Sequence, residues 1–192
     1  DGCSSLSSVT YTGTEQMWND ISKQDGNSYL ENASLTCTGE FTEVPEVPVT
    51  EISVAASEAA NTIYNLSGRN LVIVTGYCDS NTVSQIGYAV CSNSSARILL
   101  DLSGTEELTS IPSETIFGNT SLVELTLPES VTEICEGAIY GCESLKTIHS
   151  LGRVSVIQDY NFFECTNLES VTIPATLETM GLAFIQCPKL TN

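Results

Sequence analysis

The sequence has few basic residues, one histidine and one tryptophan. Six lysines and arginines stand against 24 acidic residues, and the formal net charge is −18. Nucleic acids and anionic lipid headgroups attract basic surfaces, so this balance argues against binding to either. No apolar run approaches the roughly 20 residues that cross a membrane. We therefore expect no nucleic-acid partner and no direct membrane insertion.

Groups that commonly carry catalysis or bind metals are also sparse. His149 is the only histidine, and no GxSxG motif places a serine for nucleophilic attack. No CxxC pair indicates a zinc site, and no loop of the DxDxDG type indicates calcium. The sequence predicts a protein that is not an enzyme and that uses no cofactor or metal.

An apolar pattern recurs along the second half of the chain. Six apolar offsets repeat in four successive segments, and only Gly104 and Ser150 break the pattern. A period of about 20 to 29 residues led by leucines is typical of leucine-rich repeats. The prediction is an α/β repeat fold, a leucine-rich-repeat solenoid with a parallel sheet and four coils of about 23 residues. The leading residues follow at intervals of 23, 23, 23 and 22: Leu99, Leu122, Leu145, Leu168 and Leu190.

Each coil is predicted to contribute one strand to the parallel sheet. In residues 123–127 the alternation turns Leu125 and Leu127 inward, and Pro128 ends the strand. The outward positions either form a solvated face that suits Ser and Thr or a shallow polar groove for an extended protein partner. Trp, Tyr and Arg, which dominate tight interfaces, are absent from them. This candidate partner-binding strip consists of Asp101, Ser103, Glu124, Thr126, Thr147, His149, Ser170 and Thr172.

Residues 52–98 carry a different pattern, which predicts a helix followed by a βαβ unit. A helical apolar face covers residues 55–66, and a continuous apolar strand covers residues 70–76. Ser80 is placed to cap a second helix, after which residues 97–102 return as a strand. A crossover of this length joins parallel strands. We expect this unit to shield the first coil as an N-terminal cap.

The segment before it looks like the end of an earlier array. Residues 9–11 and 33–38 are predicted strands, and Trp18 is expected to cover the end of a core. The proline-spaced, acidic stretch that follows is typical of a stiff connector, and both ends of the chain look like cuts. The predicted organisation is a closing coil and cap of a preceding array over 1–41, a Pro-containing linker over 42–51, a helix plus βαβ cap over 52–98, and the repeat array over 99–192.

The repeat carries a family resemblance. SLVELTLPESVTEI at 121–134, followed by GCESL at 141–145, resembles the BspA-like leucine-rich repeat of bacterial surface proteins, with the pattern LxxLxLPxSVTxIGxxAFxGCxSL. TGTEQMWNDI at 12–21 resembles the terminator of arrays in that family, and residues 99–111 resemble its opening coil. The resemblance implies a secreted or cell-surface protein, some relatives of which are adhesins for host matrix proteins or partner bacteria.

Three departures from the family pattern affect local geometry. Cys135 stands where the pattern has glycine, and Asn161 replaces the usual alanine. The third coil lacks its proline and has Ser150-Leu151-Gly152 instead.

Eight cysteines raise the question of disulfides. Cys142, Cys165 and Cys187 share one offset and should form a ladder in adjacent coils, about 5 Å apart, which falls within the range for a disulfide. Their common direction into a packed core favours reduced thiols that behave as small hydrophobes. If residues 80–91 are helical, Cys78 and Cys91 lie roughly 18 Å apart and do not pair.

Four asparagines lie in glycosylation sequons by pattern. Asn119 is better explained as an inward residue that holds backbone groups by hydrogen bonds. The others are Asn32, Asn65 and Asn93.

Together these features predict a non-catalytic leucine-rich-repeat module at the cell surface or secreted, which serves protein recognition or adhesion. Its partners would be host or bacterial surface proteins. The alternative is a structural spacer that displays another domain of a longer protein. A third and remoter hypothesis is a hydrolase with an unrecognised site.

Overall fold

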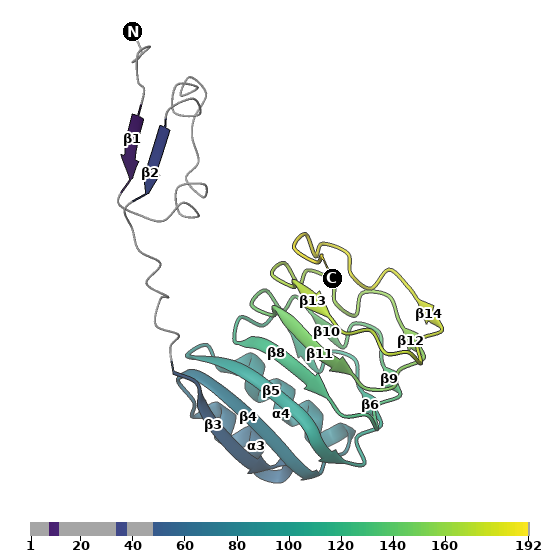
Figure 1. The fold of residues 1–192 in the computed structure, drawn as a ribbon. Coiled ribbons are helices and arrows are strands. Elements are labelled where there is room, and N and C mark those ends of the chain that lie inside the picture. The colour runs from purple at the N-terminus through teal and green to yellow at the C-terminus, as the bar shows by residue number, and fades with distance from the viewer. Residues whose placement is uncertain (1–7, 12–33, 38–47, 192) are drawn as a thin grey trace. The chain divides into compact units, whose positions relative to one another are not determined.

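The chain divides into two compact units, residues 1–46 and 47–192. The structure is a computed structural model that describes residues 8–11, 34–37 and 48–191. Figure 1 shows the strands and helices of both units.

The first unit contributes two short strands. β1 (Ser8–Tyr11) and β2 (Ser34–Cys37) pair in parallel over four residues each. Both fall where the sequence predicts strands. Trp18 and most of the predicted linker lie outside the described residues.

The second unit is built on a six-stranded sheet in which every neighbouring pair is parallel. Its order is β13-β11-β8-β5-β4-β3, so the strands follow one another across the sheet in sequence order. The strands are β3 (Thr50–Ala55), β4 (Gly68–Tyr77), β5 (Ala96–Glu106), β8 (Leu122–Leu127), β11 (Thr147–Leu151) and β13 (Ser170–Val171).

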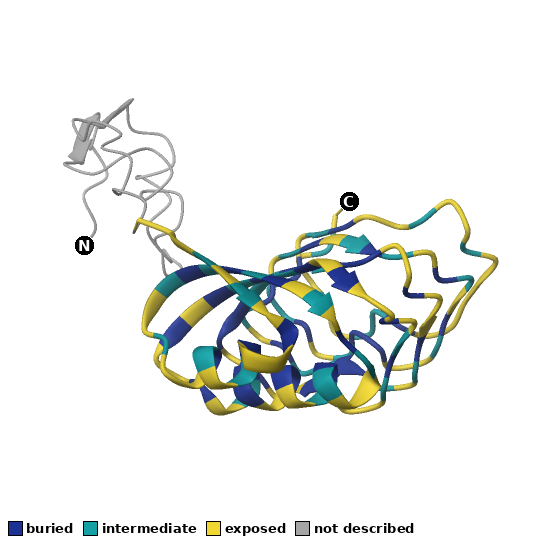
Figure 2. Ribbon diagram, turned by 90° about the horizontal axis from the view of Figure 1, so that it is seen from below, coloured by how far each residue is buried: buried dark blue, intermediate teal, exposed yellow. Residues whose placement is uncertain are grey.

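Two helices cover one face of the first three strands (Figure 2). α3 (Ala56–Tyr64) joins β3 to β4, and α4 (Ser80–Ser92) joins β4 to β5. The predicted cap of α4 was wrong by one residue, because the Asp79 carboxylate accepts the Thr82 backbone N–H at 2.8 Å. This bond lowers the pKa of Asp79. None of the described helices is long and apolar enough to span a membrane.

The sequence prediction missed the strand that precedes the first helix. Residues 50–55 form β3, which pairs with β4 over six residues, so Thr50 and Glu51 belong to the sheet rather than to the predicted linker. Ile52 and Val54 alternate with polar neighbours, a period-two pattern that fits a strand. The prediction missed this strand because the alanine-rich stretch that follows it fits a helical face. The segment is therefore strand, helix, strand, helix, strand.

Beyond β5 the chain winds through two further parallel ladders. Equivalent residues Ile111, Ile134, Ile157 and Met180 lie 23 residues apart in the four-stranded sheet. A shorter ladder pairs β7 (Ile116–Phe117) with β10 (Ile139–Tyr140). The four-stranded sheet consists of β6 (Ser110–Ile111), β9 (Glu133–Ile134), β12 (Val156–Ile157) and β14 (Thr179–Met180).

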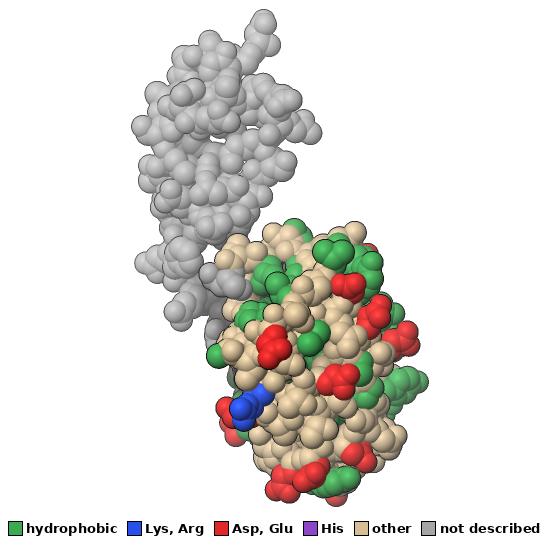
Figure 3. Space-filling view, turned by 90° about the vertical axis from the view of Figure 1, so that its right-hand side faces the viewer, with side chains coloured by type: hydrophobic (Ala, Val, Ile, Leu, Met, Phe, Trp, Pro, Cys, Tyr) green, Lys and Arg blue, Asp and Glu red, His purple; other side chains and the backbone are tan. Residues whose placement is uncertain are grey.

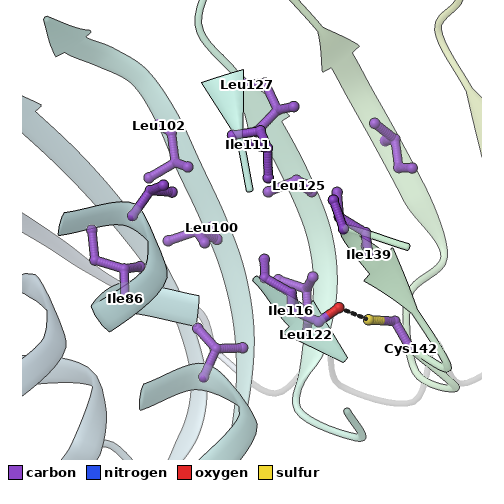
Figure 4. Packing of buried hydrophobic residues seen from close by; sticks show 14 of the residues in the cluster. Ile86, Leu100, Leu102, Ile111, Ile116, Leu122, Leu125, Leu127, Ile139 and Cys142 are labelled. Carbon is purple, nitrogen blue, oxygen red and sulfur yellow. Dashed lines mark hydrogen bonds between the residues drawn. The ribbon is translucent and has the colours of Figure 1, made fainter. Parts of the chain in front are cut away.

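One core runs from the helices into the repeats. Figure 4 shows Ile86 of α4 facing Leu100 of β5, with Leu125 and Ile139 continuing the same apolar cluster. All four side chains are at most 2% exposed. Burial of such side chains contributes about 1.5 to 3 kcal/mol each, which makes the strand–helix segment and the repeats one packed body.

Leu99 is not a core residue, contrary to the repeat alignment. The buried side chains of β5 are Ala96, Ile98, Leu100 and Leu102, and Leu99 is turned to the opposite face. A register shift between Ile98 and Leu99 lets Ile98 pair with Leu122. The residues at 98–100 are all apolar, so spacing alone selected the wrong register.

At Gly104 and Ser150, which break the apolar repeat pattern, a nearby leucine fills the core instead. Leu102 fills the core in β5, so Gly104 does not occupy a core position. In β11 a register shift between Ile148 and Ser150 brings Leu151 opposite Leu127, and Leu151 is 1% exposed. The core therefore stays apolar at both places.

The predicted cysteine ladder is confirmed. Each thiol donates to a carbonyl one coil earlier, Cys142 to Ile116 at 3.6 Å, Cys165 to Ile139 at 3.8 Å and Cys187 to Phe162 at 3.0 Å. Within residues 48–191 six cysteines are free thiols: Cys78, Cys91, Cys135, Cys142, Cys165 and Cys187. The hydrogen bond with Cys165, together with burial, raises the pKa of Cys142 well above its ordinary value.

The predicted inward role of Asn119 is also confirmed. Its side chain is 1% exposed, donates to the Val90 carbonyl at 2.8 Å, and accepts the N–H groups of Ser121 and Leu122. This residue therefore ties the end of α4 to the start of β8. Asn93, from another sequon, is also buried and donates to the Ile63 carbonyl.

Candidate functional site: the outer face of the parallel sheet

The face of the six-stranded sheet turned away from α3 and α4 is here called the outer face. Its side chains follow from strand alternation, because each strand turns every second residue away from the core. Strand pairing aligns them in two rows across the sheet. The first row is Glu51, Leu71, Leu99, Glu124, Thr147 and Ser170, and the second is Ser53, Ile73, Asp101, Thr126 and Ser150.

The rows give the outer face its dimensions. Neighbouring strands lie about 4.8 Å apart, so the six residues of the first row span about 24 Å. Two residues along a strand separate the rows by about 7 Å. This size suits a segment of protein rather than a small molecule.

Five residues of the predicted strip lie in these rows. Glu124, Thr147 and Ser170 share the first row, and Asp101 and Thr126 share the second.

The other three residues of the strip lie outside the rows. Ser103 is exposed, and its N–H donates to the Asp101 carboxylate at 2.8 Å. Thr172 is exposed just beyond the end of β13. His149 lies in the irregularity of β11, so Ser150 takes the pairing position that the sequence assigned to it.

A cluster of ionisable groups joins three strands on the outer face. The Glu124 carboxylate lies 2.7 Å from Nε2 of His149 and 4.0 Å from the Arg69 guanidinium. Arg69 pairs in register with Arg97 on the next strand. Contacts between ionisable side chains this open to solvent contribute little to stability, typically about 0 to 1 kcal/mol. Their effect is to hold Glu124 and His149 in a defined arrangement.

Apolar side chains adjoin this cluster. Leu71, Ile73 and Leu99 are half-buried on the outer face. Within residues 48–191 both helices pack against the opposite face, so neither helix covers these three residues. An apolar centre with a charged rim is the usual anatomy of a protein interface.

Sequence reasoning missed the part of this face that precedes the repeats. The run at 70–76 predicts one continuous apolar strand, a pattern that fits a strand covered on both sides. The available signal was the alternation itself, since Val72 and Val74 are buried while Leu71 and Ile73 are not. The arginines absent from the predicted strip are present on β4 and β5.

The arrangement offers little for metal binding or for nucleophilic catalysis. Among the described residues, no group of three His, Cys, Asp or Glu side chains is placed to hold a metal ion. His149 is hydrogen-bonded to Glu124, and within residues 48–191 it contacts no serine, threonine or cysteine by a side-chain hydrogen bond.

The repeats identify the family. A family model described as the BspA type leucine-rich repeat region matches residues 84–192 in 6 copies. The chain belongs to this family. BspA-type leucine-rich repeats are typically non-catalytic, generally occur in bacterial surface or secreted proteins, and leucine-rich-repeat domains generally bind proteins. No curated protein and no solved structure matches the chain.

The match confirms the resemblance and extends it. It begins within α4, ahead of the predicted array boundary at residue 99, and has 6 copies where the sequence pattern predicts four coils. The BspA-type region thus includes the end of the helical segment as well as the outer-face strands β5, β8, β11 and β13.

Proposed function

We propose that the chain is a non-catalytic module, on the cell surface or secreted, that recognises another protein through the outer face. Its partner would be a host or bacterial surface protein, and its role would be adhesion. The observation that carries the proposal is a continuous parallel sheet whose outer face presents half-buried Leu71, Ile73 and Leu99 beside the Arg69, Glu124 and His149 cluster.

The chemistry of the face supports recognition of an extended protein segment. The apolar side chains supply area that is removed from water on binding, worth about 25 cal/mol per Å². Arg69 and Arg97 supply planar, multidentate donors of the kind enriched in interface hot spots. Thr126, Thr147 and Ser170 offer hydroxyl donors and acceptors along the same rows.

We also propose the organisation around this face. Residues 99–192 form an array of four coils, and the strand–helix segment at 50–98 caps it, because the open end of a solenoid core needs cover. Residues 1–41 close a preceding array, and residues 42–49 link the two.

The alternative role is a structural spacer that displays another domain. The polar, Ser- and Thr-containing coil strands suit a solvated face that binds nothing. The half-buried leucines on β4 and β5 favour recognition over this alternative.

Binding to immobilised host matrix proteins and to bacterial cells tests the proposal. Leu71→Ser with Leu99→Ser removes the apolar centre of the outer face, and we expect about tenfold weaker binding, the effect of losing about 1.4 kcal/mol. The control is Tyr64→Ser with Tyr88→Ser, at two exposed tyrosines of α3 and α4, which should leave affinity unchanged. Circular dichroism checks that both variants fold.

Two results would contradict recognition through this face. One is the absence of any retained partner for the native chain. The other is equal binding by the native chain and the Leu71→Ser, Leu99→Ser variant, which would leave the spacer role as the better account.

A further inference from the structure

A second surface lies on the turns of the coils, apart from the outer face. It is a shallow groove of about 360 Å³ whose walls come from three successive passes of the chain. The first pass supplies Glu114, the second Glu136 and Tyr140, and the third Tyr160 and Phe163. The groove therefore combines carboxylates with aromatic rings, and its lining contains no lysine or arginine.

The backbone under this groove repeats with the coils. Glu114, Gly137 and Tyr160 lie 23 residues apart, with φ of 54°, 62° and 60°. This left-handed conformation suits glycine and is unfavourable for a bulky side chain. Tyr160 adopts it while 46% exposed, so burial of its ring in the core does not account for it. The same conformation recurs at Glu164 and Gln186, with φ of 57° and 60°, so it belongs to the turns of the coils.

The aromatic rings are held in fixed relative positions. Tyr160 and Phe163 meet edge to face with centroids 5.9 Å apart, and Phe117 stacks on Tyr140 at 5.7 Å. Phe117, Tyr140 and Phe163 also follow at intervals of 23 residues. Ring faces fixed in this way attract cations through the ring quadrupole, by about 0.5 to 1 kcal/mol at exposed sites.

The charge of the groove has no partner within the described part of the chain. Both ion pairs there involve Glu124, on the outer face, and neither involves Glu114 or Glu136. Acidic side chains also predominate over basic ones on the side that carries the four-stranded sheet (Figure 3). A cation that enters the groove therefore meets unpaired carboxylates and no competing basic residue.

We propose that this groove binds lysine or arginine side chains of a basic, extended segment in a partner protein. The cation lies against the rings of Tyr140, Tyr160 and Phe163 and between the carboxylates of Glu114 and Glu136. This site is separate from the proposed outer-face function and does not depend on it.

Titration calorimetry of the 192-residue chain with an acetylated hexa-arginine peptide, at 0.15 M salt, tests the proposal. Tyr160→Asn removes the ring but keeps a residue that tolerates the left-handed backbone. We expect about three- to fivefold weaker binding from the lost cation–π contact. Glu114→Gln with Glu136→Gln should weaken binding about tenfold, as expected for two charge-assisted contacts.

The matched control separates the groove from general electrostatic attraction. Glu129→Gln with Glu178→Gln removes the same charge from a different shallow surface whose lining contains no aromatic residue. It should change the affinity less than twofold. The proposal is overturned if the control weakens binding as much as the groove variant, if Tyr160→Asn binds like the native chain, or if the peptide does not bind the native chain.

Discussion

Two glycines with the same backbone conformation give a direct measure of how closely the coils approach. Gly118 and Gly152 both have left-handed φ, of 55° and 73°. A Cβ added at Gly118 meets nothing within 4 Å, whereas one added at Gly152 lies 2.6 Å from the Pro128 carbonyl oxygen and 2.7 Å from that of Val131. Gly118→Ala therefore tests backbone strain alone, and Gly152→Ala adds the contact between coils.

The magnitudes follow from these distances. The left-handed backbone conformation costs alanine about 1 to 2 kcal/mol. Alanine also lowers the conformational entropy of the unfolded chain, which offsets about 0.4 to 1 kcal/mol of that cost. We expect Gly118→Ala to lower the free energy of unfolding by about 1 kcal/mol. In Gly152→Ala the coils must also move apart, at about 1 to 3 kcal/mol for overpacking. The shift weakens the 2.7 Å bond from Arg153 N–H to the Val131 carbonyl, worth about 1 kcal/mol.

Urea unfolding at 25 °C, followed by circular dichroism, measures the difference. Gly152→Ala should be less stable than Gly118→Ala by about 2 to 4 kcal/mol, with unchanged m-values. Equal destabilisation of the two variants would refute the close approach of Gly152 to the preceding coil.

Two further predictions concern buried groups. Asn119→Ala leaves three backbone groups without their bonds, including the Val90 carbonyl, so we expect about 3 kcal/mol lower stability. The exposed neighbour variant Thr120→Ala should stay within about 0.5 kcal/mol in the same urea assay, and equal losses would count against the role of Asn119. Burial, together with Asp79, raises the pKa of Cys78 from 9.0 to about 11. Between pH 9 and about 11 the unfolded chain loses the Cys78 proton while the folded protein keeps it, which favours unfolding. The free energy of unfolding is therefore unaffected by this thiol below pH 9 and decreases as the pH rises to about 11. Cys78→Ala should flatten the decline in urea midpoint between pH 9 and 11, and an unchanged slope would contradict the assignment.

Periodicity predicted the parts of the fold in which one apolar residue has no apolar neighbour. Leu125 and Ile148 stand between polar residues, so the 23-residue spacing fixes their direction. The inward cysteines and Asn119 were predictable for the same reason. In residues 98–100 three adjacent apolar side chains satisfy either register, and only packing against α4 selects Ile98 and Leu100 for the core.

The outer face was predictable in part. Alternation within one strand is enough to turn Glu124 and Thr126 outward. Which residues share a row depends on pairing between strands about 25 residues apart, and the register shifts at Leu99 and His149 change that pairing. The contact of Arg69 with Glu124 crosses an intervening strand, β5. No local pattern in the sequence encodes that contact.

The proposed function requires that a protein partner contacts the outer face. A photo-cross-linking residue placed at Thr126, in the middle of the second row, tests this contact. The experiment is done in cells, or with a partner that the binding assay has retained. The matched position is Tyr88, which is 64% exposed on α4. The account predicts cross-links to the partner from position 126 and none from position 88. Cross-links from position 88 alone, or none from position 126 while the partner is bound, would contradict it.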